Sequence, residues 1–325
     1  MKFAIAALIA NASAYELGQL MTAEDYKFMA FVSEQGRSFG TVAEFNFRSN
    51  IFKQRLAEHE KINNAPGATS TVGVNFLTDR TDEEIKQLLG YKEMPTDVKT
   101  NEMVLNTTDL ADEINWITKG AVTPVKNQGQ CGSCWSFSTT GAMEGAHFVA
   151  TGNLVSLSEQ NLVDCSWLNH GCNGGSMPLA FMYAESHPLE TEAEYPYTAK
   201  TGLFDCKYSK AKGVVEVKSF ANVPARSSAA LKAALAKGPV AVAIEADKTV
   251  FHGYTGGIIT GSACGTSLDH GVLAVGYGSD AGQEYYLVKN SWTTAWGEQG
   301  YVRIGVEDGA GVCGIQMSAS QPVTN

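Results

Sequence analysis

The chain has 325 residues, of which 44% are hydrophobic and 18% are charged, a balance typical of globular proteins and not of disordered or fibrous ones. Its length allows two compact units and an extension. The formal net charge of −10 argues against nucleic acids and anionic membranes as partners, because both select basic surfaces.

Residues 1–14 have the pattern of a secretory signal peptide. An early lysine precedes a short apolar run, and small residues end at Ala14, so cleavage is predicted before Tyr15. The run is too short to cross a bilayer, and no later segment reaches about 18 uninterrupted apolar residues. We therefore expect no membrane span. The destination is predicted to be the secretory pathway, either a lysosome or acidic vacuole or the extracellular space, where disulfides persist.

Residues 15–108 contain no cysteine and are predicted to be mainly helical. Thr22 has the character of a helix cap, and residues 42–63 form a longer helix with aromatic and aliphatic residues at helical spacing. Residues 72–76 are predicted as a short strand and residues 81–89 as a short helix.

The stretch from 91 to 108 is polar and loses all periodicity, so it is predicted to be a linker. It contains Asn106-Thr107-Thr108, a sequon that makes Asn106 a candidate for N-glycosylation.

In the remaining residues, the predicted secondary structure changes once along the chain, from helices to strands. Helices are predicted at 133–152, 158–165, 178–186 and 231–236, and strands at 240–245, 271–277, 285–289 and 300–304. A helical half followed by an antiparallel β half predicts an α+β protein with a cleft between the halves.

All seven cysteines follow Gln130. They are Cys131, Cys134, Cys165, Cys172, Cys206, Cys264 and Cys313. An odd number in a secreted chain leaves one thiol over or makes an intermolecular bridge, and the count alone does not say which thiol that is.

Cys134 is the candidate nucleophile, because it stands at the predicted start of a helix. A thiolate there is stabilised by free backbone N–H groups and by the helix dipole, which lowers the thiol pKa. The alternative is that Cys131 and Cys134 form a redox or metal-binding pair, although further zinc ligands at matching spacing are not evident.

Five motifs follow one another between residues 112 and 318. They are Gly120–Phe137, Leu157–Cys165, Gly171–Gly175, Leu268–Val272 and Lys289–Trp292. In order and spacing they resemble the papain-like cysteine peptidases, specifically the cathepsin L-like branch. The preceding segment resembles the inhibitory propeptide of that family, with Glu44, Arg48, Phe52 and Asn63 on its long helical motif.

The resemblance implies a preproenzyme with a signal peptide at 1–14, an inhibitory propeptide at 15–108 and a papain-like peptidase domain at 109–325. The implied fold is a helical left domain beside an antiparallel, barrel-like right domain, with a mainly helical propeptide lying backwards through the cleft. Because both parts are acidic, we expect the propeptide to dock through its phenylalanine-bearing helices and not by charge attraction.

The resemblance also assigns the catalytic residues. Cys134 is the nucleophile and His270 the base, while Asn290 orients the imidazole and Gln128 donates to the oxyanion. Taken alone, a histidine beside a strand is more often an ordinary polar residue, and an asparagine is more often part of a turn. Only the order of the motifs singles them out.

Substrate-binding residues follow from the same motifs. Gly174 and Gly175 are expected to pair with the substrate backbone, and Trp292 to shield the imidazole and border the leaving-group side. The pocket for the side chain one residue before the scissile residue is assigned to Met177, Ala243, Leu268, Gly271 and Ser318. It carries no charge, which favours Leu, Phe or Val.

The implied disulfides are Cys131–Cys172, Cys165–Cys206 and Cys264–Cys313. No cofactor or metal is expected. The expected partners are protein and peptide substrates, the propeptide itself and cystatin-type inhibitors, and the chain is expected to be a monomer.

Three departures from the family pattern bear on function. Arg55 and His59 stand in the propeptide where the family usually has Asn and Ile, and they bear on the strength of self-inhibition. Thr293 replaces a usual glycine after Trp292, at a position where the backbone φ is expected to be positive.

The sequence therefore predicts a cysteine endopeptidase that works through a thiolate–imidazolium pair and is made as an acid-activated zymogen. No insertion between Cys131 and Gly174 blocks the cleft, so internal peptide bonds should fit. Two other functions are compatible with parts of the pattern: a catalytically silent binding or storage protein on the same fold, and a disulfide oxidoreductase using Cys131 and Cys134.

Overall fold

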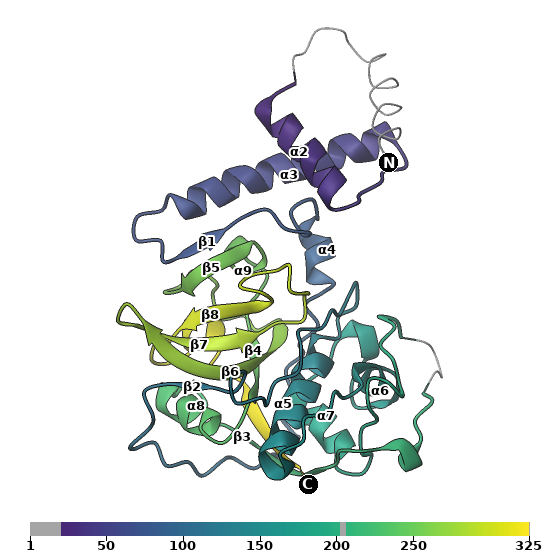
Figure 1. Ribbon diagram of the computed structural model, residues 1–325, viewed down its shortest axis with the longest axis vertical. Helices are drawn as coiled ribbons and strands as arrows, with labels where there is room; N and C mark the ends of the chain where they lie inside the picture. The colour runs from purple at the N-terminus through teal and green to yellow at the C-terminus, as the bar shows by residue number, and fades with distance from the viewer. Residues whose placement is uncertain (1–20, 202–205, 325) are drawn as a thin grey trace.

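The computed structural model describes residues 21–201 and 206–324. The predicted signal peptide lies outside the described residues. Two parts are visible in Figure 1: a helical N-terminal part, and a larger part in which helices lie beside a curved sheet. Within the described residues, no helix is both long enough and apolar enough to cross a membrane.

The N-terminal part is built on two crossing helices, α2 (Ala23–Glu34) and α3 (Val42–Asn63). Thr22 caps α2 as predicted, since its hydroxyl accepts from the Asp25 N–H at 3.2 Å. The predicted bounds of α3 agree with the structure.

The phenylalanines of these helices pack on one another. The Phe52 ring lies 4.9 Å from Phe31 and 5.4 Å from Phe28, centroid to centroid, and all three side chains are buried. They make a small core of the propeptide's own. The prediction that they dock the propeptide was therefore wrong: they bury their area against each other and not against the peptidase part.

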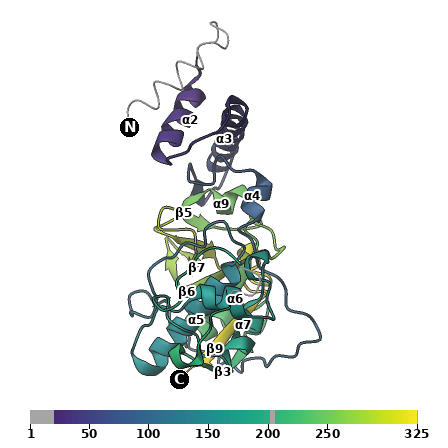
Figure 2. The same cartoon turned by 90° about the vertical axis from the view of Figure 1, so that its right-hand side faces the viewer.

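The apolar and backbone contacts of docking come instead from the chain after α3, while α3 itself makes polar contacts to Thr249 of the peptidase part. Strand β1 (Ser70–Val72) pairs antiparallel with β5 (Tyr254–Ile259) of the peptidase part, and α4 (Asp82–Lys86) follows. Apolar side chains of this stretch, Leu77, Ile85 and Leu88, are buried in the main core of the peptidase part. Both views place α3 above α9 (Thr249–His252) and β5 (Figures 1 and 2). Apolar burial and a backbone ladder thus hold the propeptide.

Of the helices of the peptidase part, α5 (Cys134–Thr151), α6 (Glu159–Cys165) and α7 (Met177–Ala184) lie together on one side of the sheet, and α8 (Ser228–Leu235) lies on the other side, near β2 (Ile114–Asn115) (Figure 1). Helix α8 begins earlier than predicted, because the Ser227 hydroxyl accepts from the Ala230 N–H at 3.1 Å and caps it there. Gly141 lets α5 approach the sheet, since an added Cβ would lie 2.7 Å from Leu273 Cδ2.

The strands of the peptidase part form one sheet with β1 at its edge, in the order β1-β5-β8-β7-β6-β4-β9-β3, and β2 pairs with β6. They are β2 (Ile114–Asn115), β3 (Val217–Asn222), β4 (Val240–Ile244), β5, β6 (His270–Asp280), β7 (Gln283–Lys289), β8 (Tyr301–Gly305) and β9 (Ala319–Thr324). The α+β prediction is confirmed, with one exception to its antiparallel character: β5 and β8 run parallel. The long connection between them permits this direction.

Three disulfides join Cys131 to Cys172, Cys165 to Cys206, and Cys264 to Cys313, the pairs implied by the resemblance. Among the described cysteines, Cys134 alone is a free thiol. A bridged Cys131–Cys134 pair is therefore absent from this structure, and Cys131 is held by a different partner.

Candidate active site

The thiol of Cys134 lies where the helical part meets the sheet. Cys134 is the first residue of α5, and its Sγ accepts from the backbone N–H of Gly271 at 3.3 Å. His270, the first residue of β6, precedes Gly271 and is fully buried. The helix start and the strand start thus place the thiol beside the residue that carries the imidazole.

The imidazole of His270 is held in place by Asn290 and Trp292. His270 Nε2 lies 2.9 Å from Asn290 Oδ1, which also accepts from the Ser291 N–H at 2.8 Å. The Trp292 ring, 1% exposed, lies 4.9 Å from the imidazole, centroid to centroid, and shields this bond from water. Among the described residues, His270 Nδ1 has no hydrogen-bond partner. The ring therefore keeps one nitrogen available for a proton exchange.

Gln128 is oriented by two hydrogen bonds to its carboxamide oxygen. Oε1 accepts from Ser291 Oγ at 2.7 Å and from Trp292 Nε1 at 3.0 Å. Nε2 donates to the carbonyl of Leu88, a propeptide residue, at 2.9 Å. The amide is thus aimed at a carbonyl oxygen in the cleft, as an oxyanion donor requires. Ser291 was not predicted from the sequence, although it stands inside the Lys289–Trp292 motif.

The propeptide runs through the cleft as an extended strand. The Gly90 N–H donates to Cys134 Sγ at 3.2 Å, and the Gly90 carbonyl accepts from the Gly175 N–H at 2.8 Å. The Lys92 N–H donates to the Gly175 carbonyl at 2.8 Å, and the bridge between Tyr91 and Gly175 is parallel. Residues 88–92 therefore cover the thiol. The predicted helix over 81–89 is wrong at its end: α4 ends at Lys86, the Leu88 and Leu89 N–H groups donate to the Ile85 and Lys86 carbonyls in a turn, and the chain then enters the cleft at Gly90.

Gly174 and Gly175 line this path for a steric reason. A Cβ added at Gly174, whose φ is +106°, would lie 2.6 Å from the Gly90 carbonyl oxygen. At Gly175 it would lie 2.4 Å from Asn169 Oδ1. At Gly174, only glycine lets a peptide backbone come so close to this wall, whereas Gly175 must be glycine because it packs against Asn169 and Trp135 of the peptidase part itself.

Tyr91 fills the apolar pocket predicted from the sequence. It packs in one hydrophobic cluster with Met177 and Ala243, and Leu268 lies against that cluster. Its hydroxyl lies 2.9 Å from Ser318 Oγ. Gly271 borders the pocket too, since its added Cβ would lie 3.2 Å from Met177 Sδ. The structure thus brings the pocket residues together around an aromatic side chain, which was predicted only as the start of a linker.

Burial under the propeptide neutralises the thiol and the imidazole. It raises the pKa of Cys134 to about 11, and the hydrogen bonds from Gly271 and Gly90 offset only part of this shift. It lowers the pKa of His270 to about 4 despite the hydrogen bond to Asn290. The prediction of an ion pair does not describe this covered state, because both groups are removed from water, which favours their neutral forms.

Thr293 has a φ of +64°, the left-handed conformation expected of a glycine at this position. Replacing Thr293 with glycine is expected to stabilise the protein by about 1 kcal/mol, because a β-branched residue is strained there. Thermal unfolding of the Cys134→Ala protein, with and without Thr293→Gly, measures the change. A lower melting temperature in the glycine variant would contradict this prediction.

Comparisons with known proteins agree with this geometry. The family model described as "Papain family cysteine protease" matches residues 110–323, and "Cathepsin propeptide inhibitor domain (I29)" matches residues 28–85. The chain belongs to the papain family of cysteine proteases. It carries the propeptide of the family's zymogens, and the recognition made from the sequence motifs is confirmed.

Curated relatives align with most of this chain, including both the propeptide and the peptidase part. Digestive cysteine proteinase 1 of Homarus americanus is 41% identical over 318 residues, covering 94% of this chain and 97% of the relative. The probable cysteine protease RD21C of Arabidopsis thaliana is 43% identical over 298 residues, covering 89% of this chain. This chain spans 66% of that plant relative's length and 62% of another, RD21B.

Solved zymogen structures are similar as well. Digestive procathepsin L 3 of Tenebrio molitor superposes with a TM-score of 0.82 at 37% identity, covering 93% of this chain and 99% of that one. The recombinant stem bromelain precursor gives a TM-score of 0.85 at 32% identity, with the same two coverages. This papain-family chain therefore has the fold of a cathepsin-type proenzyme.

Proposed function

We propose that this zymogen is the precursor of an endopeptidase in which Cys134 attacks the scissile carbonyl carbon. His270 takes the thiol proton and passes it to the leaving amine, which leaves a thioester on Sγ. Water, deprotonated by the same imidazole, then releases the acid product and restores the thiol. The observation that carries this proposal is the free thiol at the start of α5 beside an imidazole fixed by Asn290.

The thiolate–imidazolium pair is assigned to the open enzyme. Once the propeptide leaves, water reaches the cleft and the helix dipole and an imidazolium both favour the thiolate. The oxyanion takes the place of the Leu88 carbonyl beside Gln128 Nε2. Substrates with Phe, Leu or Val in the pocket around Met177 fit its uncharged lining, which Tyr91 already fills in the zymogen.

Acid release of the propeptide is assigned to the interface that His59 shares with α9. His59 is 5% exposed, and its Nε2 would lie 2.9 Å from a Cβ added at Gly253. Its Nδ1 has no hydrogen-bond partner within the described chain. A proton added here would therefore be buried without an acceptor.

The charges around His59 oppose its protonation. Arg55 and Glu58 face it from α3, and His252 faces it from α9. Arg55 is bonded in turn to Asp82, to Glu58 at 2.8 Å and to Thr249 at 3.3 Å. Burial, and then Arg55, lower the pKa of His59 from 6.5, and Glu58 only partly offsets them.

The sign of this shift gives the direction of the pH effect. Released propeptide carries a histidine of ordinary pKa, so docking keeps its full affinity above about pH 6.5. Affinity falls as the pH drops from there toward the lowered pKa of docked His59. By contrast, Arg48 holds the pKa of Glu84 at about 2, so this ion pair inside the propeptide persists to more acidic pH. The propeptide is therefore released before its own fold is lost.

The compartment that fits this behaviour is an acidic one reached through the secretory pathway, a lysosome or vacuole, or an acidic extracellular fluid. Asn106 is exposed and is proposed as a glycosylation site. The domain limits proposed are 15–108 for the propeptide and 109–325 for the peptidase.

The deciding experiment is acid activation of the recombinant zymogen, followed by hydrolysis of a fluorogenic peptide with Phe or Leu before Arg. We expect hydrolysis and labelling of the protein by a thiol-directed epoxide, and neither in Cys134→Ala. N-terminal sequencing of the activated product locates the cleavage site. An acid-treated wild-type chain that neither hydrolyses the peptide nor takes up the epoxide would refute the proposed function.

A further inference from the structure

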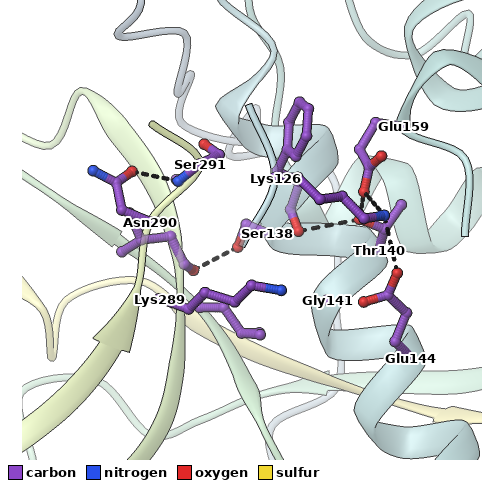
Figure 3. Close-up of a pocket in the computed structure, with 13 residues that line it drawn as sticks. Lys126, Ser138, Thr140, Gly141, Glu144, Glu159, Lys289, Asn290 and Ser291 are labelled. Carbon is purple, nitrogen blue, oxygen red and sulfur yellow. Dashed lines mark hydrogen bonds and ion pairs between the residues drawn. The ribbon is translucent and has the colours of Figure 1, made fainter. Parts of the chain in front are cut away.

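Behind the active site, four charged side chains, three buried and one partly buried, gather where α5 and α6 meet the sheet (Figure 3). They are Lys126, Glu144, Glu159 and Lys289, and we refer to them as the charged cluster. Glu144 and Glu159 are each 1% exposed, and Lys289 is 9% exposed. A cavity of about 20 Å³ between them is also lined by Asn290 and Ser291. The cluster therefore lies directly behind the residues that orient the imidazole and the oxyanion donor.

The cluster joins the two halves of the peptidase through a continuous series of polar contacts. Lys126 Nζ donates to Glu159 Oε1 at 2.6 Å and to Glu144 Oε1 at 3.2 Å. Thr123 Oγ1 donates to Glu144 Oε2 at 2.7 Å and accepts from Lys289 Nζ at 3.0 Å. Helices α6 and α5 are thus linked to the end of strand β7. Two lysines face two glutamates, so their formal charges balance, while burial raises the pKa of Glu159 to about 7.

The two lysines come from the two segments that carry Gln128 and Asn290. Lys289 immediately precedes Asn290, and Lys126 stands two residues before Gln128. The segments also bond to each other: the Gln128 N–H donates to the Ser291 carbonyl at 2.9 Å, and the Thr293 N–H to the Lys126 carbonyl at 3.2 Å. A shift of either lysine would therefore move a candidate catalytic side chain.

We propose that Lys126 and Lys289 are positioning residues that fix Gln128 and Asn290 relative to Cys134, through Glu144 and Glu159 of the opposite half. This inference rests on the proposed function, because it assigns a purpose to the placement of those groups. Neither lysine touches the reacting atoms. Each acts through the backbone segment it anchors.

The state of Lys289 supports the assignment. Within the described chain, no carboxylate lies at ion-pair distance from its ammonium, and its direct contact is the Thr123 hydroxyl. Burial lowers the pKa of Lys289 to about 8, and Glu144 offsets only part of this shift. Simple stability does not require such a set of buried charges, since replacing all of them together by apolar side chains of similar volume is often neutral or stabilising.

The test separates positioning from folding by means of a charge-neutral pair of substitutions. Lys289→Met leaves a single ammonium group, that of Lys126, opposite the two buried carboxylates, and it is expected to lower both the melting temperature and kcat, the latter at least tenfold. The double variant Lys289→Met/Glu144→Gln removes both charges. We expect its melting temperature to recover toward that of the wild type, while kcat stays at least tenfold low and KM changes little.

Three further measurements complete the design. Thr123→Val removes the hydroxyl between Lys289 and Glu144 without changing any charge, and it is expected to lower kcat in the same direction. In these variants, the alkaline limb of the pH profile of kcat/KM should shift to lower pH. The reason is that a less firmly held His270 stabilises the thiolate less. Lys212→Met, which breaks an exposed pair with Glu194, is the control and should match the wild type.

The outcomes distinguish the two proposals. A wild-type enzyme without peptidase activity refutes the proposed function itself. An active wild type, with a double variant that regains both melting temperature and kcat, shows that the cluster serves folding alone and overturns the inference. If the Lys289 variants do not fold, Thr123→Val decides: an unchanged kcat and pH profile overturns the inference, and a lowered kcat with a shifted alkaline limb supports it.

Discussion

Replacing Gln128 with alanine is expected to lower kcat by about 10²–10³-fold with little change in KM. In the zymogen its Nε2 donates to the Leu88 carbonyl at 2.9 Å, which marks the place where a developing oxyanion would lie. A donor aimed there stabilises the transition state more than the bound substrate, so its loss appears in kcat. Steady-state kinetics of the acid-activated enzyme on a fluorogenic peptide give both constants.

The alanine change has a second effect that needs its own control. Gln128 Oε1 accepts from Ser291 Oγ and Trp292 Nε1, and alanine leaves both buried donors without an acceptor, so the melting temperature should also fall. Gln128→Glu keeps both of these bonds, but it removes the donating amide, which also bonds to the Cys131 carbonyl at 2.8 Å, and adds a negative charge. A glutamate variant with the kcat of the wild type would show that donation from this side chain is not needed.

Helices α2 to α8 could be predicted from the sequence because their signals are local, whereas the four-residue helix α9 was not predicted. Thr41 accepts from the Glu44 N–H at 3.1 Å and fixes the start of α3, and Gly152, with a φ of +78°, ends α5. Strands β3, β5 and β9 were not predicted, since their partners are distant in sequence and their apolar patterns are short. The parallel pairing of β5 with β8 is likewise a property of the assembled sheet.

The candidate site, too, could be predicted from the sequence only in part. Cys134, His270 and Asn290 were identified from motifs, and the structure places them together. The occupant of the cleft was not identified, because residues 90–92 are held there by bonds to a distant partner, Gly175. Nor does the sequence show that Lys126 and Lys289 meet at the same glutamate, Lys126 directly and Lys289 through the Thr123 hydroxyl. Such contacts depend on tertiary packing, which no local pattern encodes.

Replacing His59 with isoleucine is expected to keep the zymogen closed at lower pH. In the wild type, docking requires a neutral His59, because the ring is buried beside Arg55 with no acceptor for a second proton. Below about pH 6.5 the released propeptide gains a proton that the docked form resists, and the equilibrium moves toward release. Isoleucine has no proton to gain, so this contribution disappears.

The rate at which an epoxide labels Cys134 in the full-length zymogen measures the opening. Between pH 7.5 and 4, and relative to mature enzyme at the same pH, wild-type labelling should rise steeply, while His59→Ile should rise later and less. Glu60→Gln removes an exposed titratable group one residue away on α3 and should follow the wild type. The remaining pH dependence of His59→Ile should then come from His252, whose pKa burial lowers to about 3 on the other side of the interface. If His59→Ile opens over the same pH range as the wild type, the proton that releases the propeptide binds elsewhere, and the docking surface around Gly253 has no part in acid activation.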